Sequence, residues 1–218
     1  MKVGIFGGCF NPIHIGHISL VKEVAPNFKL DKILFVPNMN PYYKKTHNIS
    51  FDLICDMINA AFKDESIDYE ISDLESDLNK KYTTYETINS LTKLKTNETL
   101  YLIIGSDQFN ELPKWKNYNE LKKIIDFIVV NRDPYLINIE KLIQDNKDLY
   151  KLEEIYDRTY KIRTKEDKRL FFYDLINKFD ISSSKIKQII SSGDIVNVKE
   201  FLSPKVLNLI LEKRLYIQ

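Results

Sequence analysis

Residues 1–17 read MKVGIFGGCFNPIHIGH, and this stretch decides the fold. An apolar run at residues 3–6 leads into Gly7–Gly8, and two of the chain's three histidines, His14 and His17, follow three residues apart. A short continuous apolar run is typical of a strand buried on both faces of a parallel sheet. The glycines and the helix-period residues after them predict a turn into a helix. We therefore expect a strand, a loop and a helix at the start of the chain.

The same alternation continues along most of the sequence. The expected strands cover residues 3–6, 32–36, 99–104 and 127–130, with weaker signals at 67–71 and 170–173. The expected helices cover residues 14–24, 51–62, 85–94 and 120–125. Repeated β-α-β alternation predicts an α/β fold, a Rossmann-like doubly wound parallel sheet flanked by helices. Ligands of such sheets bind beyond the carboxyl ends of the strands where the strand order reverses, which is where the loop after residue 6 is expected.

Two helix starts carry recognisable capping signals. Thr83 with Glu86 three residues later fits a capping box. Ser203 followed by Pro204 fits an N-cap and a first-turn proline, which predicts a C-terminal helix.

We expect a single domain over residues 1–218, with a variable segment at 133–180 and a small helical C-terminal part at 181–218. The variable segment contains residues 157–169, which are dense in both charges. A solvated helix or loop is the simpler interpretation of these residues, and a partner or oligomer surface is the alternative.

Composition excludes several classes of function. The 32 basic and 31 acidic residues nearly cancel, so no overall field attracts nucleic acid or a membrane surface. No apolar run approaches membrane-spanning length, and we expect no leader sequence because residues 1–17 lack its basic, apolar and small-residue pattern. Cys9 and Cys55 are too few for a disulfide framework or a metal cluster. The sequence predicts a cytoplasmic protein without nucleic-acid or membrane partners, and it leaves a homo-oligomer open.

The glycines and histidines near the N-terminus predict a phosphate site. Gly7 and Gly8 lack side chains, so backbone N–H groups there can approach a phosphate, and the following helix adds its positive dipole end. His14 and His17 share one face of that helix, with Gly16 between them leaving room for a ligand. Neutral imidazoles can donate N–H bonds to phosphate oxygens and stabilise charge that develops there.

The histidine pair has two other interpretations. A metal site is disfavoured because no cysteine or carboxylate accompanies the pair at ligand spacing. Core histidines without chemistry are the other alternative.

A third element lies far downstream, at residues 181–187, which read ISSSKIK. Serines at a helix start present hydroxyl and N–H groups, and the lysines add positive charge. Taken alone this is an ordinary N-cap with surface lysines. Together with the histidines it indicates two helix N-termini converging on one polyphosphate.

These residues carry a resemblance to a known family. Residues 7–17, GGCFNPIHIGH, resemble the G-G-x-F-[DN]-P-x-H-x-G-H signature of HxGH nucleotidylyltransferases. Within them, residues 104–109 (IGSDQF), 112–115 (LPKW) and 129–132 (VVNR) resemble bacterial nicotinate mononucleotide adenylyltransferases. Residues 181–187 resemble that family's I-S-S-T-x-I-R motif, and the resemblance extends from residue 1 to residue 216.

The resemblance implies adenylyl transfer from ATP to nicotinate mononucleotide, with Mg²⁺ held mainly by the ATP phosphates rather than by the protein. It implies catalytic roles for His14, His17, Lys44 and Lys187. ATP would be bound by Gly7, Gly8, Cys9, Phe10, Gly105, Asp107, Ile181, Ser182 and Ser183, together with the two histidines. The mononucleotide would be bound by Thr84, Trp115, Lys116 and Arg132, with the tryptophan stacking on the nicotinate ring.

The chain departs from the family pattern at four places, one of which is around Ile54, where the family often has an arginine. Lys187 replaces an arginine and keeps the charge without the bidentate fork. Residues 41–45, PYYKK, replace the common P-P-H-[KR] and lack its histidine, although Lys44 keeps a cation there. Cys9 stands where threonine or serine is usual.

Three alternatives stay open at this point. Trp115 could be a core residue rather than a stacking platform. Lys187 and the tyrosines at 42–43 favour a related transferase, either a cytidylyltransferase or one that prefers nicotinamide mononucleotide. A non-catalytic nucleotide-binding module is the more distant alternative.

Overall fold

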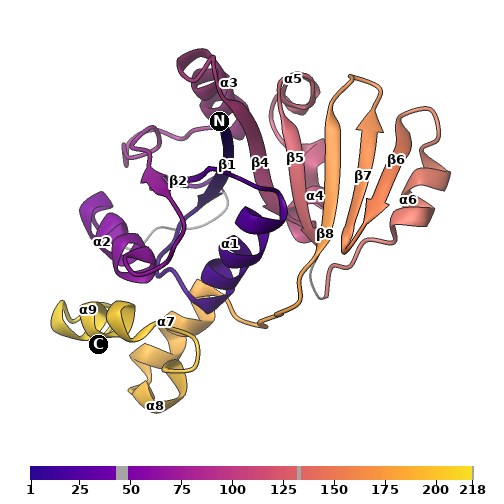
Figure 1. Ribbon diagram of the computed structural model, residues 1–218. Coiled ribbons are helices and arrows are strands. Elements are labelled where there is room, and N and C mark those ends of the chain that lie inside the picture. Colours follow the sequence, from indigo (N-terminus) through magenta and orange to yellow (C-terminus); the bar gives the residue numbers. More distant parts are fainter. Residues whose placement is uncertain (43–48, 132–133, 218) are drawn as a thin grey trace.

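The computed structural model describes residues 1–42, 49–131 and 134–217, and its strands form one eight-stranded sheet. The strand order is β3-β2-β1-β4-β5-β8-β7-β6 (Figure 1). The strands are β1 Lys2–Gly8, β2 Lys32–Pro37, β3 Tyr69–Ile71, β4 Thr99–Gly105, β5 Asp126–Asn131, β6 Tyr150–Tyr156, β7 Thr159–Thr164 and β8 Arg169–Asp174. Neighbours from β3 to β8 are parallel, whereas β7 is antiparallel to both β8 and β6. The predicted doubly wound, mostly parallel sheet is confirmed.

The sequence predicts six of the helices, which begin at residues 15, 51, 84, 118, 183 and 204, and it gives no prediction for the others. The helices are α1 Ile15–Asn27, α2 Phe51–Phe62, α3 Thr84–Leu94, α4 Ser106–Glu111, the 3₁₀ turn η1 Leu112–Lys114, α5 Tyr118–Ile124, α6 Ile139–Asp145, α7 Ser183–Ser191, α8 Ile195–Val198 and α9 Pro204–Glu212. The predicted capping box is present, because the Thr83 hydroxyl accepts from the Glu86 N–H at 3.2 Å and the Glu86 carboxylate accepts from the Thr83 N–H at 2.8 Å. Ser203 caps α9 as predicted. Within the described part of the chain, no helix has the length and apolar character needed to cross a membrane.

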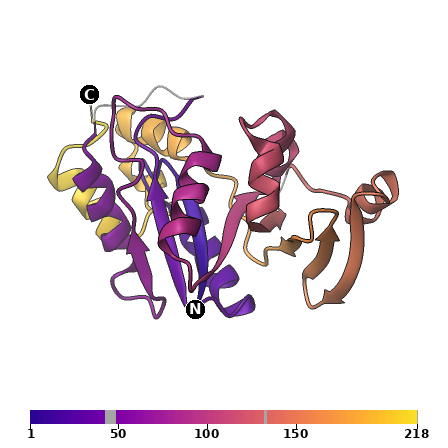
Figure 2. The same ribbon diagram turned by 90° about the horizontal axis from the view of Figure 1, so that it is seen from above.

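The sheet separates two hydrophobic cores, and helices cover both of its faces (Figures 1 and 2). On β1, Phe6 lies in the core shared with α1, α2, α7 and α9, whereas Val3 and Ile5 lie in the core shared with α3, α4 and α5. Strands buried on both sides read as continuous apolar runs, which explains the pattern at residues 3–6. β1 pairs with β2 on one side and with β4 on the other. The strand order therefore reverses beside β1, and doubly wound sheets bind their ligands at such a point, here at the carboxyl ends of β1 and β4.

The expectation of a solvated helix or loop at residues 157–169 is wrong, because these residues form β7 and the turns on either side of it. Tyr160 and Ile162 pack on the core of α3, α4 and α5. Lys161 and Arg163 lie on the opposite face of the strand, since side chains alternate along a strand. The sequence does not indicate a strand here because the residues on one of its two faces are charged, as they would be in a solvated helix or loop.

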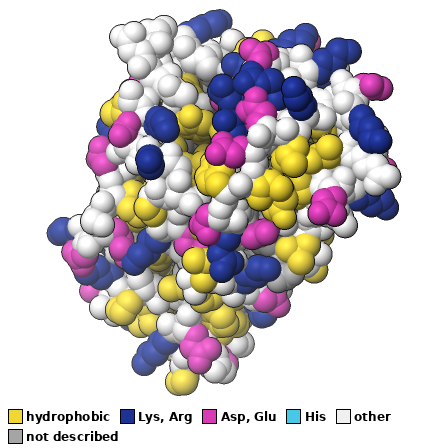
Figure 3. Space-filling view, turned by 45° about the vertical axis from the view of Figure 1, so that its right-hand side comes forward, with side chains coloured by type: hydrophobic (Ala, Val, Ile, Leu, Met, Phe, Trp, Pro, Cys, Tyr) yellow, Lys and Arg dark blue, Asp and Glu magenta, His cyan; other side chains and the backbone are white. Residues whose placement is uncertain are grey.

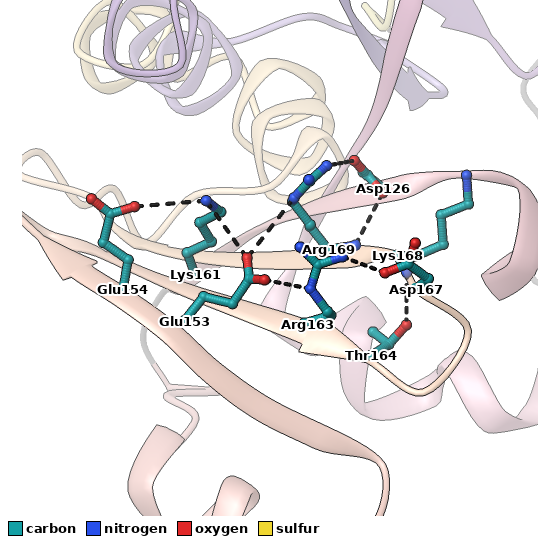
Figure 4. A network of polar contacts seen from close by, with 9 residues as sticks. All are labelled: Asp126, Glu153, Glu154, Lys161, Arg163, Thr164, Asp167, Lys168 and Arg169. Atoms are coloured by element: carbon teal, nitrogen blue, oxygen red, sulfur yellow. Dashed lines mark hydrogen bonds and ion pairs between the residues drawn. The ribbon is translucent and has the colours of Figure 1, made fainter.

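An ion network holds the β6–β7 hairpin to the parallel sheet (Figure 4). The Glu153 carboxylate on β6 forms an ion pair with Arg163 on β7. Its Oε2 also lies 3.5 Å from the Lys161 Nζ on β7 and 3.9 Å from the Arg169 Nε on β8. The Arg169 backbone N–H in turn donates to the Asp126 carboxylate on β5 at 3.0 Å. Partly exposed pairs contribute little individually, so the network mainly fixes the arrangement of four strands. Figure 3, which turns this side of the molecule forward, shows Lys and Arg gathered beside hydrophobic side chains.

Candidate functional site

The predicted glycine loops lie side by side at the carboxyl edge of the sheet. The pairing of β1 with β4 runs to Phe6 and Ile103, two residues before Gly8 and Gly105. Gly105 is the N-cap of α4, and Asp107 lies in the first turn of that helix. Both loops thus open into the crevice beside β1, where a doubly wound sheet binds its ligands.

The loop after β1 is anchored by Phe10, whose side chain belongs to the core. Phe10 is 1% exposed, has a φ of 46°, and its ring meets Phe35 edge-on at 5.5 Å. A Cβ on Gly8 would lie 3.2 Å from the Phe10 ring, so Gly8 allows the ring to fold back under the loop. Only the backbone of Phe10 is therefore available to a nucleotide. Cys9, between them, is half-buried.

The two histidines stack at the start of α1. His14 is the N-cap and His17 the third helical residue, and their ring centroids are 3.8 Å apart. The His14 backbone N–H donates to the His17 Nδ1 at 3.3 Å. An Nδ1 that accepts a hydrogen bond carries no proton, so the neutral His17 ring has its N–H at Nε2. His14 is buried and His17 half-buried, with the His17 ring edge-on to Phe10 at 5.3 Å.

Gly16 lies against the first histidine and the start of α7. A Cβ at this position would be 3.2 Å from the Nδ1 and Cε1 of His14 and 3.7 Å from the Cγ2 of Ile181. The glycine therefore keeps the space between the His14 ring and the 181–187 segment open. The close approach of the His14 ring requires a residue without a side chain at position 16, and room for a ligand there stays a prediction.

The start of α7 is fixed against the loop that precedes α1. The Ser183 hydroxyl donates to the Pro12 carbonyl at 2.9 Å, and the Ser182 hydroxyl caps α7 by accepting from the Lys185 N–H at 3.2 Å. The first N–H groups of a helix have no partner inside it and form its positive end. The expected convergence of two helix starts is therefore present, with Ser183 fixing the arrangement through its hydroxyl.

Of the predicted cations Lys44, Lys187 and Arg132, the structure describes only Lys187. Lys187 is half-buried on α7, one turn beyond Ser183. Lys44 and Arg132 lie outside the described residues, so their roles stay predictions.

Of the residues predicted to bind the mononucleotide, the structure describes Thr84 at the start of α3 and Trp115 and Lys116 between η1 and α5. Thr84 is the first residue of α3, and the half-buried Trp115 directly follows η1. Hydrogen bonds from Thr83 hold the pKa of Glu86 below its usual range, and the charge of Lys116 adds to this effect. Because Glu86 belongs to the first turn of α3, Lys116 lies near the helix start that carries Thr84. Trp115 also packs against the edge of the core beneath α3 and α5, so its two interpretations are compatible.

The C-terminal segment holds the loop between β1 and α1 through hydrogen bonds, and the sequence did not predict this contact. The Tyr216 hydroxyl donates to the Asn11 Oδ1, and the Ile15 N–H donates to the Phe201 carbonyl at 2.9 Å. Burial raises the pKa of Tyr216. The asparagine falls within the motif at residues 7–17 and the tyrosine lies at the end of the resemblance, but no spacing relates residues 205 positions apart.

A hollow of about 580 Å³ lies at the same edge of the sheet, beyond the carboxyl ends of β5 and β8. Its lining includes Asn131, which ends β5, Asp174, which ends β8, and Lys178. The Asn131 amide donates to the Asp174 carboxylate at 2.9 Å, which fixes one wall. No sequence signal indicated this hollow, because it depends on where the β8–α7 connection lies.

Comparison with known proteins gives a consistent result. The Cytidylyltransferase-like family model matches residues 5–189. A protein of Clostridium perfringens named "Probable nicotinate-nucleotide adenylyltransferase" is 34% identical over 216 residues, which is 99% of this chain and 98% of the relative. A protein of the same name from Fusobacterium nucleatum is 35% identical over 196 residues, 87% of this chain and 97% of the relative.

The fold also matches a solved structure. The nicotinic acid mononucleotide adenylyltransferase of Plasmodium falciparum, complexed with NaAD, superposes with a TM-score of 0.77 over 99% of this chain and 97% of that one, at 20% identity. At 20% identity this superposition shows a shared fold only. The relatives that match over nearly their full length show the family. The chain belongs to the nicotinate-nucleotide adenylyltransferase family of the cytidylyltransferase-like proteins.

Proposed function

We propose that this chain transfers the adenylyl group of ATP to nicotinate mononucleotide, giving nicotinate adenine dinucleotide and pyrophosphate. The observation that carries the proposal is the stacked pair His14 and His17 at the start of α1, against which the start of α7 is fixed. The relatives with this name support the same reaction. In the cell this is a step of NAD biosynthesis.

The chemistry requires positioning and charge stabilisation more than proton transfer. A phosphate oxygen of the mononucleotide attacks the α-phosphorus of ATP, and the bond from that phosphorus to the bridging oxygen breaks as pyrophosphate leaves. The attacking oxygen is already ionised at neutral pH, so no general base is needed. Donors held in advance, such as the His17 Nε2–H and the helix-start N–H groups, stabilise the charge that develops on the phosphates.

Mg²⁺ fits this site as an ion carried by the nucleotide. Among the described residues, no group of three His, Cys, Asp or Glu side chains could hold a metal. Mg²⁺ commonly keeps several waters and binds through substrate phosphates, where it neutralises part of their charge. We propose that ATP enters with its Mg²⁺ and that the protein contacts the phosphates around it.

The mononucleotide is proposed to bind between α3 and α5. Thr84 offers a hydroxyl at a helix start, and the backbone after Trp115 and the Lys116 charge lie close to the same turn. Trp115 would stack on the pyridine ring with its exposed part. Arg132 is proposed to act nearby, and it follows directly on the end of β5.

Pyrophosphate release separates this function from its rivals. Purified protein is supplied with ATP or CTP and with nicotinate or nicotinamide mononucleotide in all combinations. We expect release with ATP and nicotinate mononucleotide. Release only with CTP would indicate a cytidylyltransferase, and release with no pair would indicate a nucleotide-binding module. The cytoplasmic location, the homo-oligomer and the single domain stay predictions.

Lys187 is expected to contribute to ATP use. The Lys187→Ala variant should raise the KM for ATP roughly tenfold or more, because a charge-assisted bond to phosphate is lost. Lys187→Arg keeps the charge and should retain most of the activity or improve it. Steady-state kinetics with ATP varied at saturating mononucleotide measure both. Wild-type behaviour of Lys187→Ala would assign the charge to Lys185 or Lys44 instead.

Gly16→Ala is expected to separate activity from stability. The added methyl group would lie 3.2 Å from the His14 ring, which must shift by a few tenths of an ångström. Misplacing a group at a reacting centre on this scale costs roughly tenfold in kcat. Alanine favours the helix by up to about 1 kcal/mol over glycine, so thermal stability should be unchanged or higher. Thermal melts and kcat are measured on the same sample, and an unchanged kcat would show that the His14 position is not critical.

A further inference from the structure

A chain of hydrogen bonds links the glycine loop to the start of α3. The Asn38 N–H donates to the Gly8 carbonyl at 2.9 Å, and the next N–H, of Met39, donates to the Glu75 carbonyl at 3.2 Å. The same two loops meet again where the Asn40 amide donates to the Leu78 carbonyl at 2.7 Å. Residues 72–83 are thereby fastened to the loop after β2.

Glu75 is a buried carboxyl group at the centre of this connection. It is 6% exposed, and its Oε1 lies 2.5 Å from the Thr87 hydroxyl on α3. The Thr87 hydroxyl also lies 3.3 Å from the carbonyl of Thr83, the N-cap residue. The peptide that bears this carbonyl is the one that supplies the N–H of Thr84. Glu75 therefore reaches the turn proposed to recognise the mononucleotide through one intermediate side chain.

The Thr87 hydroxyl has one proton for two acceptors. If Glu75 is ionised, the proton must be shared between the carboxylate and the Thr83 carbonyl. If Glu75 is neutral, its own O–H donates to the Thr87 oxygen, and Thr87 donates to Thr83. Only the second arrangement satisfies both contacts in full.

We propose that Glu75 is a positioning residue for the mononucleotide, which holds the first turn of α3 in place through Thr87. This inference rests on the proposed function, because the turn it positions is the one that carries Thr84. The contact between Glu75 and Thr87 is remote from the histidine pair in sequence, and α3, which carries Thr87, packs on the opposite face of the sheet from α1. Its loss should therefore affect the mononucleotide more than ATP.

The surroundings favour the neutral form of Glu75. Burial raises its pKa to about 7, and the negative charge of Glu86 on α3 adds to this, against the lowering effect of the Thr87 bond. The described residues packed on it from the loop after β2, at 38–42, contain no Lys, Arg, Asp or Glu. Ionisation above neutral pH then weakens the hold on Thr83.

Thr87→Val tests the connection with nearly the same side-chain shape and no hydroxyl. We expect the KM for nicotinate mononucleotide to rise about fivefold, the equivalent of one ordinary hydrogen bond. The KM for ATP and kcat should change by less than about twofold, and Thr87→Ser should restore the wild-type values. Thr92→Val is the matched control, because Thr92 bonds the Asn89 carbonyl at 3.1 Å near the far end of the same helix. Equal rises in both KM values, or a loss of stability alone, would make Thr87 merely structural and overturn the proposal.

Glu75→Gln tests the carboxyl group itself. The amide donates to Thr87 at every pH, so the ratio of wild-type to variant KM for the mononucleotide should be near 1 at pH 6 and rise about fivefold by pH 8. Taking the ratio cancels titration of the substrate. A ratio that is constant across this range would contradict the proposal.

Amide hydrogen exchange keeps the inference testable without turnover. In the peptide that covers residues 83–88, Thr87→Val should exchange about fivefold faster than wild type. If the wild type releases no pyrophosphate with any mononucleotide, the proposed function fails while this measurement still applies. Equal exchange in the two proteins would remove the positioning role.

Discussion

The His17→Ala variant is expected to turn over about 100-fold more slowly than the wild type, or slower still. A donor held in advance toward developing charge is commonly worth this much in kcat. The structure holds the His17 ring from two sides, through the 3.3 Å contact of its Nδ1 with the His14 N–H and the edge-on Phe10 ring. Its neutral form thus presents the proton at Nε2. The measurement is kcat for pyrophosphate release at saturating ATP and mononucleotide.

His17→Gln is the control that separates chemistry from helix capping. Glutamine at the third helical position can still reach the N-cap N–H, as in a capping box, but provides no imidazole. We expect both variants to melt close to the wild type, because alanine favours the helix and the lost contact is long. Near-normal turnover in His17→Ala would show that the histidine is a packing residue. Recovery of turnover in His17→Gln would show that an N–H donor held at the helix start is sufficient and that the imidazole ring itself is not required.

The sequence predicts the parallel part of the sheet well because its signals are local. A continuous apolar run such as residues 3–6 requires burial on both faces, and the capping box of Thr83 and Glu86 is contained within four residues. The β-α-β alternation and the right-handed connections between parallel strands limit the possible strand orders. The start of the candidate site is local as well, since His14, Gly16 and His17 share one helix turn.

The hairpin at residues 150–164 could not be predicted in the same way. Its strands have one charged face, and the bulge between Leu152 and Glu154 shifts the alternation in β6. The ion pairs of Glu153 with β7 and β8 depend on the register between strands. A charge-dense segment therefore has the same composition whether it is a strand or a solvated loop.

The long-range contacts of the site could not be predicted from the sequence for a related reason. The Tyr216–Asn11 bond and the Ser183–Pro12 bond join residues far apart in the chain. The ionisation of Glu75 depends on burial by loops whose course the sequence does not specify. Resemblance to a family locates such residues in motifs, but only the packing of α7 and the C-terminal segment against β1 and α1 explains what they do.

The preference for acid over amide is the prediction that decides the substrate. Nicotinate and nicotinamide mononucleotides differ only in a carboxylate against a carboxamide. A carboxylate accepts hydrogen bonds and never donates, so the N–H groups and hydroxyl at the start of α3 suit it. Glu86 is the negative charge of that turn, and it is engaged by the Thr83 N–H and hydroxyl at 2.8 and 2.9 Å. The nearby Lys116 offsets it further.

An amide in this position would place its own N–H₂ against donors. Each buried group left unpaired costs about 1–3 kcal/mol. Two such mismatches give a preference for the acid on the order of 100-fold or more in kcat/KM. No lysine or arginine has to contact the carboxylate for this, so the neutral side chain of Thr84 is sufficient.

Thr84→Val and Thr84→Ser show whether the hydroxyl contributes to the preference. Valine should reduce the acid-to-amide ratio roughly fivefold, since the hydroxyl's charge-assisted bond to the carboxylate is stronger than the bond that it can form with a neutral amide. Serine keeps the hydroxyl and should leave the ratio close to that of the wild type. The measurement is kcat/KM for both mononucleotides under one set of conditions, with ATP saturating. Equal values for the wild type, or a preference for the amide, would reject the nicotinate assignment and leave adenylyl transfer intact, because the histidine pair contacts only the phosphates in this proposal.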